Sequence, residues 1–305
     1  MIIPPSPRQQ TQERKLRYPG SLMLLAMVGC NAASVSAEPG PVTVPPGYEL
    51  VWSDEFDRDG ALDPAKWTFE QGYVRNGEMQ WYQSENAQVS GGRLIIEGRR
   101  EHKPNPLFGS PALKPQFRAR RTINFTSASV STKGRQSWTY GHFEIRAKIR
   151  AEQGLWPALW FVGTEGRWPA GGEIDLMEYY QGRILANFGW ASKVPGKPTW
   201  NSVKVPVSEL GDNPGWDESF HVWTMDWDAK QISLHVDGRL INQLDLSKVD
   251  SANPTGIANP FRRPQYLIMN LALGGENGGP LQDTRLPTRF EIDYVRVYQR
   301  TGGLR

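Results

Sequence analysis

Cysteine is almost absent from this sequence. Cys30 is the only one among 305 residues, so no disulfide can form within the rest of the chain and the fold must be held by its hydrophobic core. Excess charge is lacking too, because the net charge is +3 and Lys and Arg are scattered. This excludes the basic stripe typical of nucleic-acid-binding proteins. Four isolated histidines lack the spacing of a zinc site: His102, His142, His221 and His235.

Long hydrophobic runs are missing as well. The run Leu22–Val28 is too short to cross a bilayer, so we expect no transmembrane segment. Basic residues precede it and the small residues Val35-Ser-Ala37 follow it, a pattern typical of a secretory signal. We therefore predict that residues 1–37 are a secretory or lipoprotein signal segment. Two fates remain open: cleavage after Ala37, or lipidation of Cys30, whose preceding residues resemble a lipobox. The protein would accordingly be secreted, periplasmic or anchored to a membrane.

Helical periodicity is scarce in residues 41–300, which we predict to be a single domain without linkers or repeats. Residues 141–149 alternate apolar and polar side chains, as in a sheet with one wet face. Residues 231–241 contain Asp237-Gly238 between two such runs, a strong hairpin signal. Residues 265–273 are apolar on both faces, which indicates a central strand, and residues 290–298 supply a closing strand. The sequence predicts an all-β sandwich of two antiparallel sheets.

Three acids follow one another within residues 173–178, which read Glu-Ile-Asp-Leu-Met-Glu. Glu173 and Asp175 share a face of a regular strand, whereas Glu178 would point the other way. One extra residue at Met177, forming a β-bulge, would return Glu178 to the same face. Paired carboxyls about 5–5.5 Å apart serve as nucleophile and acid in retaining glycosidases. The alternative is an exposed, solvated strand face.

Tryptophans lie close to these acids. Trp156 and Trp160 are in phase on the segment Leu155-Trp-Pro-Ala-Leu-Trp160. Indole faces stack on the apolar faces of sugar rings, so tryptophans beside paired carboxyls favour a carbohydrate site. Packing in the core is the alternative for either residue.

Taken together, these motifs resemble glycoside hydrolase family 16, in its laminarinase-like, endo-β-1,3-glucanase branch. The resemblance covers nearly the whole of residues 41–300. It is carried by the Glu-x-Asp-x-x-Glu strand and by further segments in the same order: 51–57, 76–82, 140–144, 270–275 and 293–298.

The resemblance implies a concanavalin-like β-jelly roll with a concave substrate cleft. It implies that Glu173 is the nucleophile, Asp175 the assisting acid and Glu178 the acid/base of an endo-acting retaining hydrolase. The substrate would be a polysaccharide, most simply a β-1,3(4)-glucan of the laminarin type, and the enzyme a monomer. Substrate-binding residues would be Asn76, Trp156, Trp160, Asn187 and Trp190.

The resemblance implies no cofactor for catalysis but one structural calcium ion. Its ligands would be Glu55, the backbone of Gly92, and Asp293, since calcium takes oxygen ligands. The alternative interpretation of the acids near Glu55 is a polar turn before Leu62.

Two segments depart from the family pattern. A Thr-x-His-Tyr-like stretch normally follows the acids, but here residues 184–190 contain no histidine, and Asn187 and Trp190 lie in its place. The late Gly-Gly-Asn-Trp loop is replaced by Gly274-Gly-Glu-Asn-Gly-Gly279. Both changes affect the recognition of the sugar, so β-galactans remain an alternative substrate. A transglycosylase and a non-catalytic lectin remain alternatives to a hydrolase.

Overall fold

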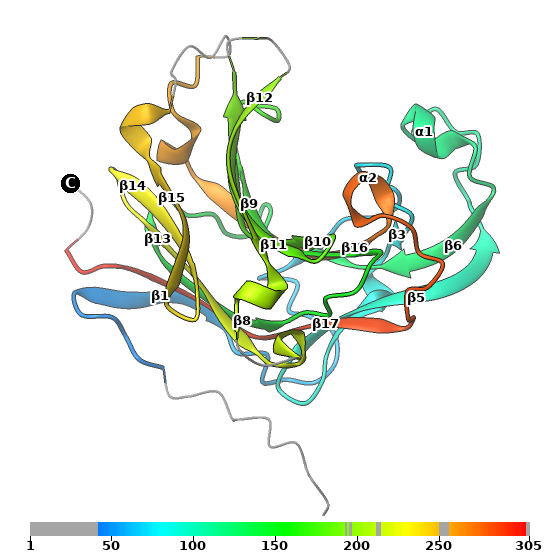
Figure 1. The fold of residues 1–305 in the computed structure, drawn as a ribbon, viewed down its shortest axis with the longest axis horizontal. Helices are drawn as coiled ribbons and strands as arrows, with labels where there is room; N and C mark the ends of the chain where they lie inside the picture. The colour runs from blue at the N-terminus through cyan, green and yellow to red at the C-terminus, as the bar shows by residue number, and fades with distance from the viewer. Residues whose placement is uncertain (1–41, 193, 195–196, 212–214, 250–255, 303–305) are drawn as a thin grey trace, which may run out of the picture. The chain divides into compact units, whose positions relative to one another are not determined.

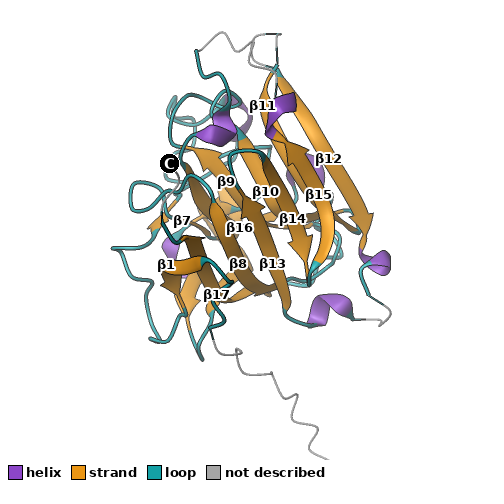
Figure 2. Cartoon of the chain, turned by 90° about the vertical axis from the view of Figure 1, so that its left-hand side faces the viewer, coloured by secondary structure: helices purple, strands orange, loops and turns teal. Residues whose placement is uncertain are grey.

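Strands make up nearly all regular structure in the computed structural model, which describes residues 42–192, 194, 197–211, 215–249 and 256–302. The predicted signal segment, residues 1–37 with Cys30, lies outside these residues. Two sheets pack against each other (Figures 1 and 2). Among the described residues, none of the helices has the length and apolar character needed to cross a membrane.

One sheet, which we call the β10 sheet, has seven strands in the order β12-β11-β10-β9-β16-β7-β2. Every neighbouring pair in it is antiparallel. Its strands in chain order are β2 (Thr68–Phe69), β7 (Ser129–Ser131), β9 (Leu155–Gly163), β10 (Glu173–Tyr180), β11 (Arg183–Ala191), β12 (Pro198–Pro206) and β16 (Gln265–Leu273).

The second sheet, the β17 sheet, follows the order β15-β14-β13-β8-β17-β5-β6-β3, with β1 paired to β17 and β4 paired to β5. Its strands are β1 (Tyr48–Asp54), β3 (Trp81–Tyr82), β4 (Ala87–Val89), β5 (Leu94–Pro104), β6 (Thr122–Ser127), β8 (Gly141–Lys148), β13 (His221–Trp227), β14 (Gln231–Val236), β15 (Arg239–Asp245) and β17 (Thr288–Arg300).

Helices are few and short in the described residues. The α-helices are α1 (Pro115–Arg118) and α2 (Gly275–Gly278), and the 3-10 turns are Ser84–Asn86, Val207–Glu209, Trp216–Glu218, Leu246–Lys248 and Pro260–Arg262. The all-β sandwich predicted from the alternating segments is confirmed, and so is the jelly roll that the family resemblance implies.

The main core lies between the two sheets and follows from the alternation of side chains. In β8, Phe143, Ile145 and Ala147 are buried while the residues between them are partly exposed. Each fully buried large apolar side chain of this kind stabilises the fold by roughly 1.5–3 kcal/mol. β16 is buried along nearly its whole length and lies between β9 and β7, as predicted for a central strand. Asp237 and Gly238 join β14 to β15 with φ angles of 49° and 77°, which suit a type I′ hairpin turn.

Candidate active site

Strand β10 presents three acids on one face because it contains a β-bulge. Its pairing with β9 shifts between Asp175 and Met177, so Leu176 is the extra residue. Leu176 and Met177 both enter the core, with exposures of 2% and 0%. Glu178 therefore returns to the face of Glu173 and Asp175, which we call the acid face. The predicted bulge is confirmed, since on the β11 side Leu176 and Met177 together oppose the single residue Ala186.

Glu173 lies at the start of β10 and is partly exposed. The indole Nε1 of Trp168, from the loop between β9 and β10, donates a hydrogen bond of 2.5 Å to its Oε2. Burial raises the pKa of Glu173, while Trp168, Asp175 and the Arg75 guanidinium act in the opposite direction. These three groups all favour the ionised carboxylate that a nucleophile needs.

Asp175 lies between the two glutamates and is only 2% exposed. Its Oδ2 accepts a hydrogen bond of 2.9 Å from the amide of Asn187 on β11. Burial raises the pKa of Asp175 well above its usual range, and the neighbouring charges of Glu178 and Glu173 add to the effect. The Asp175 carboxyl in turn donates a hydrogen bond that lowers the pKa of Glu173.

Glu178 is the third acid and accepts two hydrogen bonds. Trp156 Nε1 donates to Oε1 at 2.9 Å, and Asn187 Nδ2 donates to Oε2 at 3.1 Å. Burial raises the pKa of Glu178 to about 7, and the charge of Glu173 adds to the shift. A carboxyl poised near 7 can donate a proton in one step and accept one in the next. The three carboxyls thus differ in their hydrogen-bond partners and in how their pKa values are raised.

The predicted tryptophan pair lies on the acid face of β9. Trp160 Nε1 donates a hydrogen bond of 2.7 Å to Asn270 of β16, and the Arg75 guanidinium lies 5.0 Å from its ring centroid. Trp156 is only 6% exposed and packs edge-on against Tyr180. Both indoles therefore orient neighbouring polar groups and line the site, and little of Trp156 is left for stacking on a sugar.

Trp190 is the one predicted substrate-binding residue that the structure removes from the site. It belongs to the main hydrophobic core, with an exposure of 6%, and its ring contacts Phe261 edge-on. β11 pairs regularly with β12 through this stretch, so Asn187 and Trp190, three residues apart, point to opposite faces. The prediction that Trp190 lines the cleft is wrong, whereas Asn187 does lie beside the acids.

Comparisons with known proteins agree with this geometry. The family model described as "Glycosyl hydrolases family 16" matches residues 79–296, which include all three acids. The chain belongs to glycosyl hydrolase family 16. It is therefore a glycoside hydrolase, an enzyme that cleaves O-glycosidic bonds.

Three known proteins show how similar this chain is to characterised enzymes. It is 33% identical to a β-glucanase of Rhodothermus marinus over 94% of this chain and 96% of that protein. The laminarinase catalytic domain of Thermotoga petrophila superposes with a TM-score of 0.69 at 34% identity, covering 83% of this chain and 98% of that one. A structure from work on endo-acting O-glycanases of the human gut microbiota that initiate mucin breakdown gives a TM-score of 0.75 at 33% identity, covering 86% and 94%.

Asn76 lies in a loop beside the site and has a positive φ of 52°. Its side chain donates to Glu78 at 3.4 Å, and its carbonyl accepts from the Glu276 N–H at 2.9 Å. Asn76 therefore joins this loop to the start of α2. Its predicted contact with substrate stays a prediction.

Two residues of the site gave no recognised signal in the sequence. Arg75 pairs with Glu70, which also accepts a hydrogen bond of 2.7 Å from Ser129 of β7. Trp168 contacts Glu173 directly from an irregular loop. Strand periodicity cannot assign a facing direction to loop residues such as these. Trp168 nevertheless precedes Glu173 by only five positions, in a Trp-Pro dipeptide, and this proximity could have suggested a place in the site.

The predicted calcium ligands lie away from the acids. Glu55 accepts hydrogen bonds of 2.7 and 3.0 Å from Arg296, and Asp293 pairs with Arg146 at 2.5 Å. These guanidinium groups occupy carboxylate oxygens that a cation would need. No group of three or more His, Cys, Asp or Glu side chains in the described parts of the chain is placed to hold a metal. Calcium binding therefore stays a prediction that the described arrangement does not favour.

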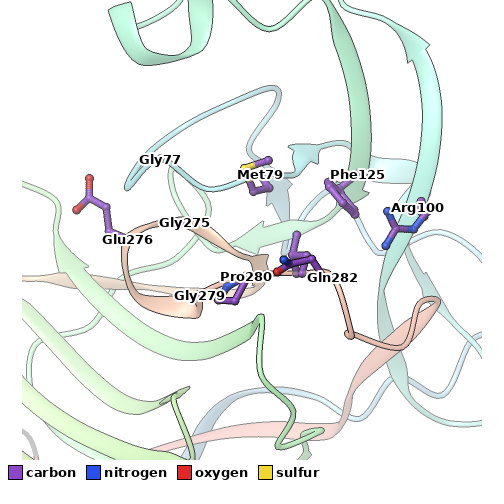
Figure 3. A pocket seen from close by; sticks show the side chains of 10 residues that line it. Gly77, Met79, Arg100, Phe125, Gly275, Glu276, Gly279, Pro280 and Gln282 are labelled. Carbon is purple, nitrogen blue, oxygen red and sulfur yellow. The ribbon is translucent and has the colours of Figure 1, made fainter.

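A cavity of about 810 Å³ lies apart from the trio, and none of the three acids lines it. Met79, Phe125, Pro280 and Leu281 give it an apolar lining, with the Arg100 side chain at its edge (Figure 3). Neither this apolar lining nor a single arginine supplies the paired carboxyls of glycoside hydrolysis. The paired carboxyls lie on the acid face instead.

Proposed function

We propose that the protein is an exported, endo-acting β-glucanase that cleaves internal β-1,3(4) linkages with retention of configuration. The observation that carries the proposal is the alignment of Glu173, Asp175 and Glu178 on one face, with Glu178 poised near neutrality. The β-glucanase and laminarinase relatives support the choice of substrate.

In the first step, a carboxylate oxygen of Glu173 bonds to the anomeric carbon while the glycosidic C–O bond breaks. Glu178 gives its proton to the departing oxygen, so the leaving sugar departs as an alcohol. Asp175 holds Glu173 in the ionised form through its own proton. Trp168 fixes one oxygen of Glu173, so the carboxylate approaches in one orientation.

In the second step, Glu178 is a carboxylate and takes a proton from a water molecule. The water oxygen bonds to the anomeric carbon, and the bond to Glu173 breaks, which restores both carboxyls. Two inversions give net retention. A sugar hydroxyl in place of water would give transglycosylation, so products should be compared with and without an added acceptor oligosaccharide.

The experiment that tests the substrate is a panel of laminarin, lichenan, agarose, carrageenan and arabinogalactan, with reducing ends measured over time. We expect the fastest release from laminarin or lichenan, with oligosaccharides as early products because cleavage is internal. Activity confined to the galactans, or release of single sugars alone, would overturn the proposal.

A second candidate substrate is a galactose-containing glycan, which Asn187 favours. Its amide stands where laminarinase-like sequences carry a histidine, and its Nδ2 donates to both Asp175 and Glu178. Gluco- and galacto-configured sugars differ in the direction of one hydroxyl, and sites built on hydrogen bonds discriminate sharply between such sugars. The structure from work on endo-acting O-glycanases is about as similar to this chain as the laminarinase structure is. Overall similarity therefore does not by itself select a glucan as the substrate.

Export is part of the proposal and rests on residues 1–37. Their basic, apolar and small-residue segments support either cleavage after Ala37 or a lipid on Cys30. Mass spectrometry of the protein recovered from a bacterial host would separate the two fates. A Cys30→Ser variant that still fractionates with membranes would exclude the lipid. We expect the released enzyme to be monomeric.

A further inference from the structure

The backbone conformation at Gly189 of β11 does not require a glycine. Its φ is not among the positive values of the chain, and it is buried in the middle of a regular ladder. A Cβ added there would lie 2.7 to 3.0 Å from three ring atoms of Trp200. The glycine is therefore needed because the Trp200 indole lies directly over it.

Trp200 and Gly189 stand in one row with the nucleophile. Glu173 of β10 pairs with Gly189, and Gly189 pairs with Trp200 of β12. Paired residues point to the same side of a sheet, so Trp200 lies on the acid face. Strands are about 4.8 Å apart, and the indole reaches back over Gly189 toward Glu173.

Trp200 differs from the tryptophans on β9 in what its ring can contact. Trp156 is 6% exposed, and the Arg75 guanidinium lies over the ring of Trp160. Trp200 is 42% exposed although it sits on a sheet face beside buried residues. An exposed indole beside an acid trio offers a flat apolar surface to a sugar ring.

We propose that Trp200 is the stacking platform of a sugar-binding subsite next to Glu173, and that Gly189 leaves the room its ring needs. The sugar that stacks there belongs to the same chain as the sugar attacked by Glu173. This inference rests on the proposed glycan hydrolysis but not on which polysaccharide is the substrate. It deepens that function by assigning a binding residue.

The test uses oligosaccharides of three to six sugars from whichever polysaccharide the enzyme cleaves best, labelled at the reducing end so that the cleaved bond is identified. Longer chains fill more subsites, so the dependence on length reports on binding beyond the cleaved bond. In wild type, kcat/KM should rise with length. We expect Trp200→Ala to lose roughly 10- to 100-fold in kcat/KM on the longer substrates and much less on the shortest. Trp200→Phe should keep most of the gain.

Gly189→Ala provides a matched test, because its added methyl displaces the indole without removing it. It should reproduce the length-dependent loss of Trp200→Ala. Phe108→Ala, which removes another exposed aromatic ring, should leave the length dependence unchanged. The inference is overturned if Trp200→Ala follows the wild-type length dependence, or if its loss is equal at every length. If the enzyme cleaves another glycan but not β-glucans, the proposed substrate is wrong. The role of Trp200 can then still be tested with oligosaccharides of that other glycan.

Discussion

At the scale of single residues, the site gives three chemically similar carboxyls three different states. Burial raises the pKa of each, but their partners differ. Glu173 accepts a hydrogen bond from Trp168 that favours its anion, while the enclosed Asp175 has its pKa raised well above the usual range. Glu178 accepts from Trp156 and Asn187 and titrates near 7. The environment of each acid therefore decides its role.

The activity should depend on pH through these states. Glu178 must be protonated and its pKa is raised to about 7, so kcat/KM should fall about tenfold per unit as pH rises above that value. On the acidic side, activity should be lost as Glu173 takes up a proton. This loss should occur at a higher pH than for an ordinary glutamate, because the pKa of Glu173 is raised. The three acids interact as they titrate, so the pKa read from each limb of the pH profile is an apparent value of the set.

Trp156→Phe offers a control for this pH profile. The Trp156 indole stabilises ionised Glu178 and lowers its pKa, so removing that hydrogen bond should move the basic limb to higher pH. A basic limb that does not respond to Trp156→Phe would show that a different group titrates there.

Asn187 should govern the ranking of substrates. Asn187→Ala removes hydrogen bonds to Asp175 and Glu178, and we expect a loss of about 10- to 100-fold on the preferred polysaccharide. Asn187→His should shift the ranking toward laminarin. Asn242→Ala removes another buried amide, on β15, and should lower stability without changing the ranking. Unchanged activity and ranking in both Asn187 variants would exclude this role.

At the scale of elements, the bulge in β10 can be tested by deletion. Removing Leu176 leaves Asp175 and Met177 adjacent, which keeps Asp175 and Glu178 on the acid face of a regular strand. Removing Ile174 instead would turn Glu173 to the core side. Both deletions remove one buried side chain. We expect the Leu176 deletion to keep a folded protein with reduced but measurable hydrolysis, and the Ile174 deletion to have none.

Circular dichroism would show whether each deletion variant folds, and reducing-end assays would measure its hydrolysis. Equal loss of hydrolysis in two folded variants would contradict the account of the strand phase. The result depends only on which side chains share a face, so it does not require the substrate to be known.

Strands with clear alternation could be predicted from the sequence, and irregular segments could not. β8 and the β14–β15 hairpin follow from period-two patterns, and β16 follows from a run that is apolar on both faces. Three acids in this phase share one face only if the strand contains a bulge, so the bulge can be predicted from them. Trp190 lies in the core because a spacing of three residues from Asn187 reverses the face of a regular strand. Trp168 and Arg75 come from loops, where side-chain direction depends on tertiary contacts that no local pattern encodes.

At the scale of the whole molecule, no metal is needed for the chemistry derived above. Incubation with EDTA should leave kcat/KM unchanged at temperatures well below Tm, because catalysis uses carboxyls alone. The predicted calcium site would instead appear in thermal unfolding. A decrease in Tm on chelation that added Ca²⁺ reverses, and that Asp293→Asn abolishes, would establish it. Loss of activity in a fully folded, chelated enzyme would contradict the metal-free mechanism.

The central claim is that Glu173 is the nucleophile of a retaining double displacement. Glu173→Ala should reduce turnover by several orders of magnitude while leaving the fold intact, because it removes a partly exposed carboxylate and little core volume. Azide can enter the vacated space, so added azide should restore activity on an activated aryl glycoside. Nuclear magnetic resonance of the product is the most direct measurement. We expect a glycosyl azide of inverted configuration, and near-normal activity of Glu173→Ala without azide would contradict the role of Glu173 as nucleophile.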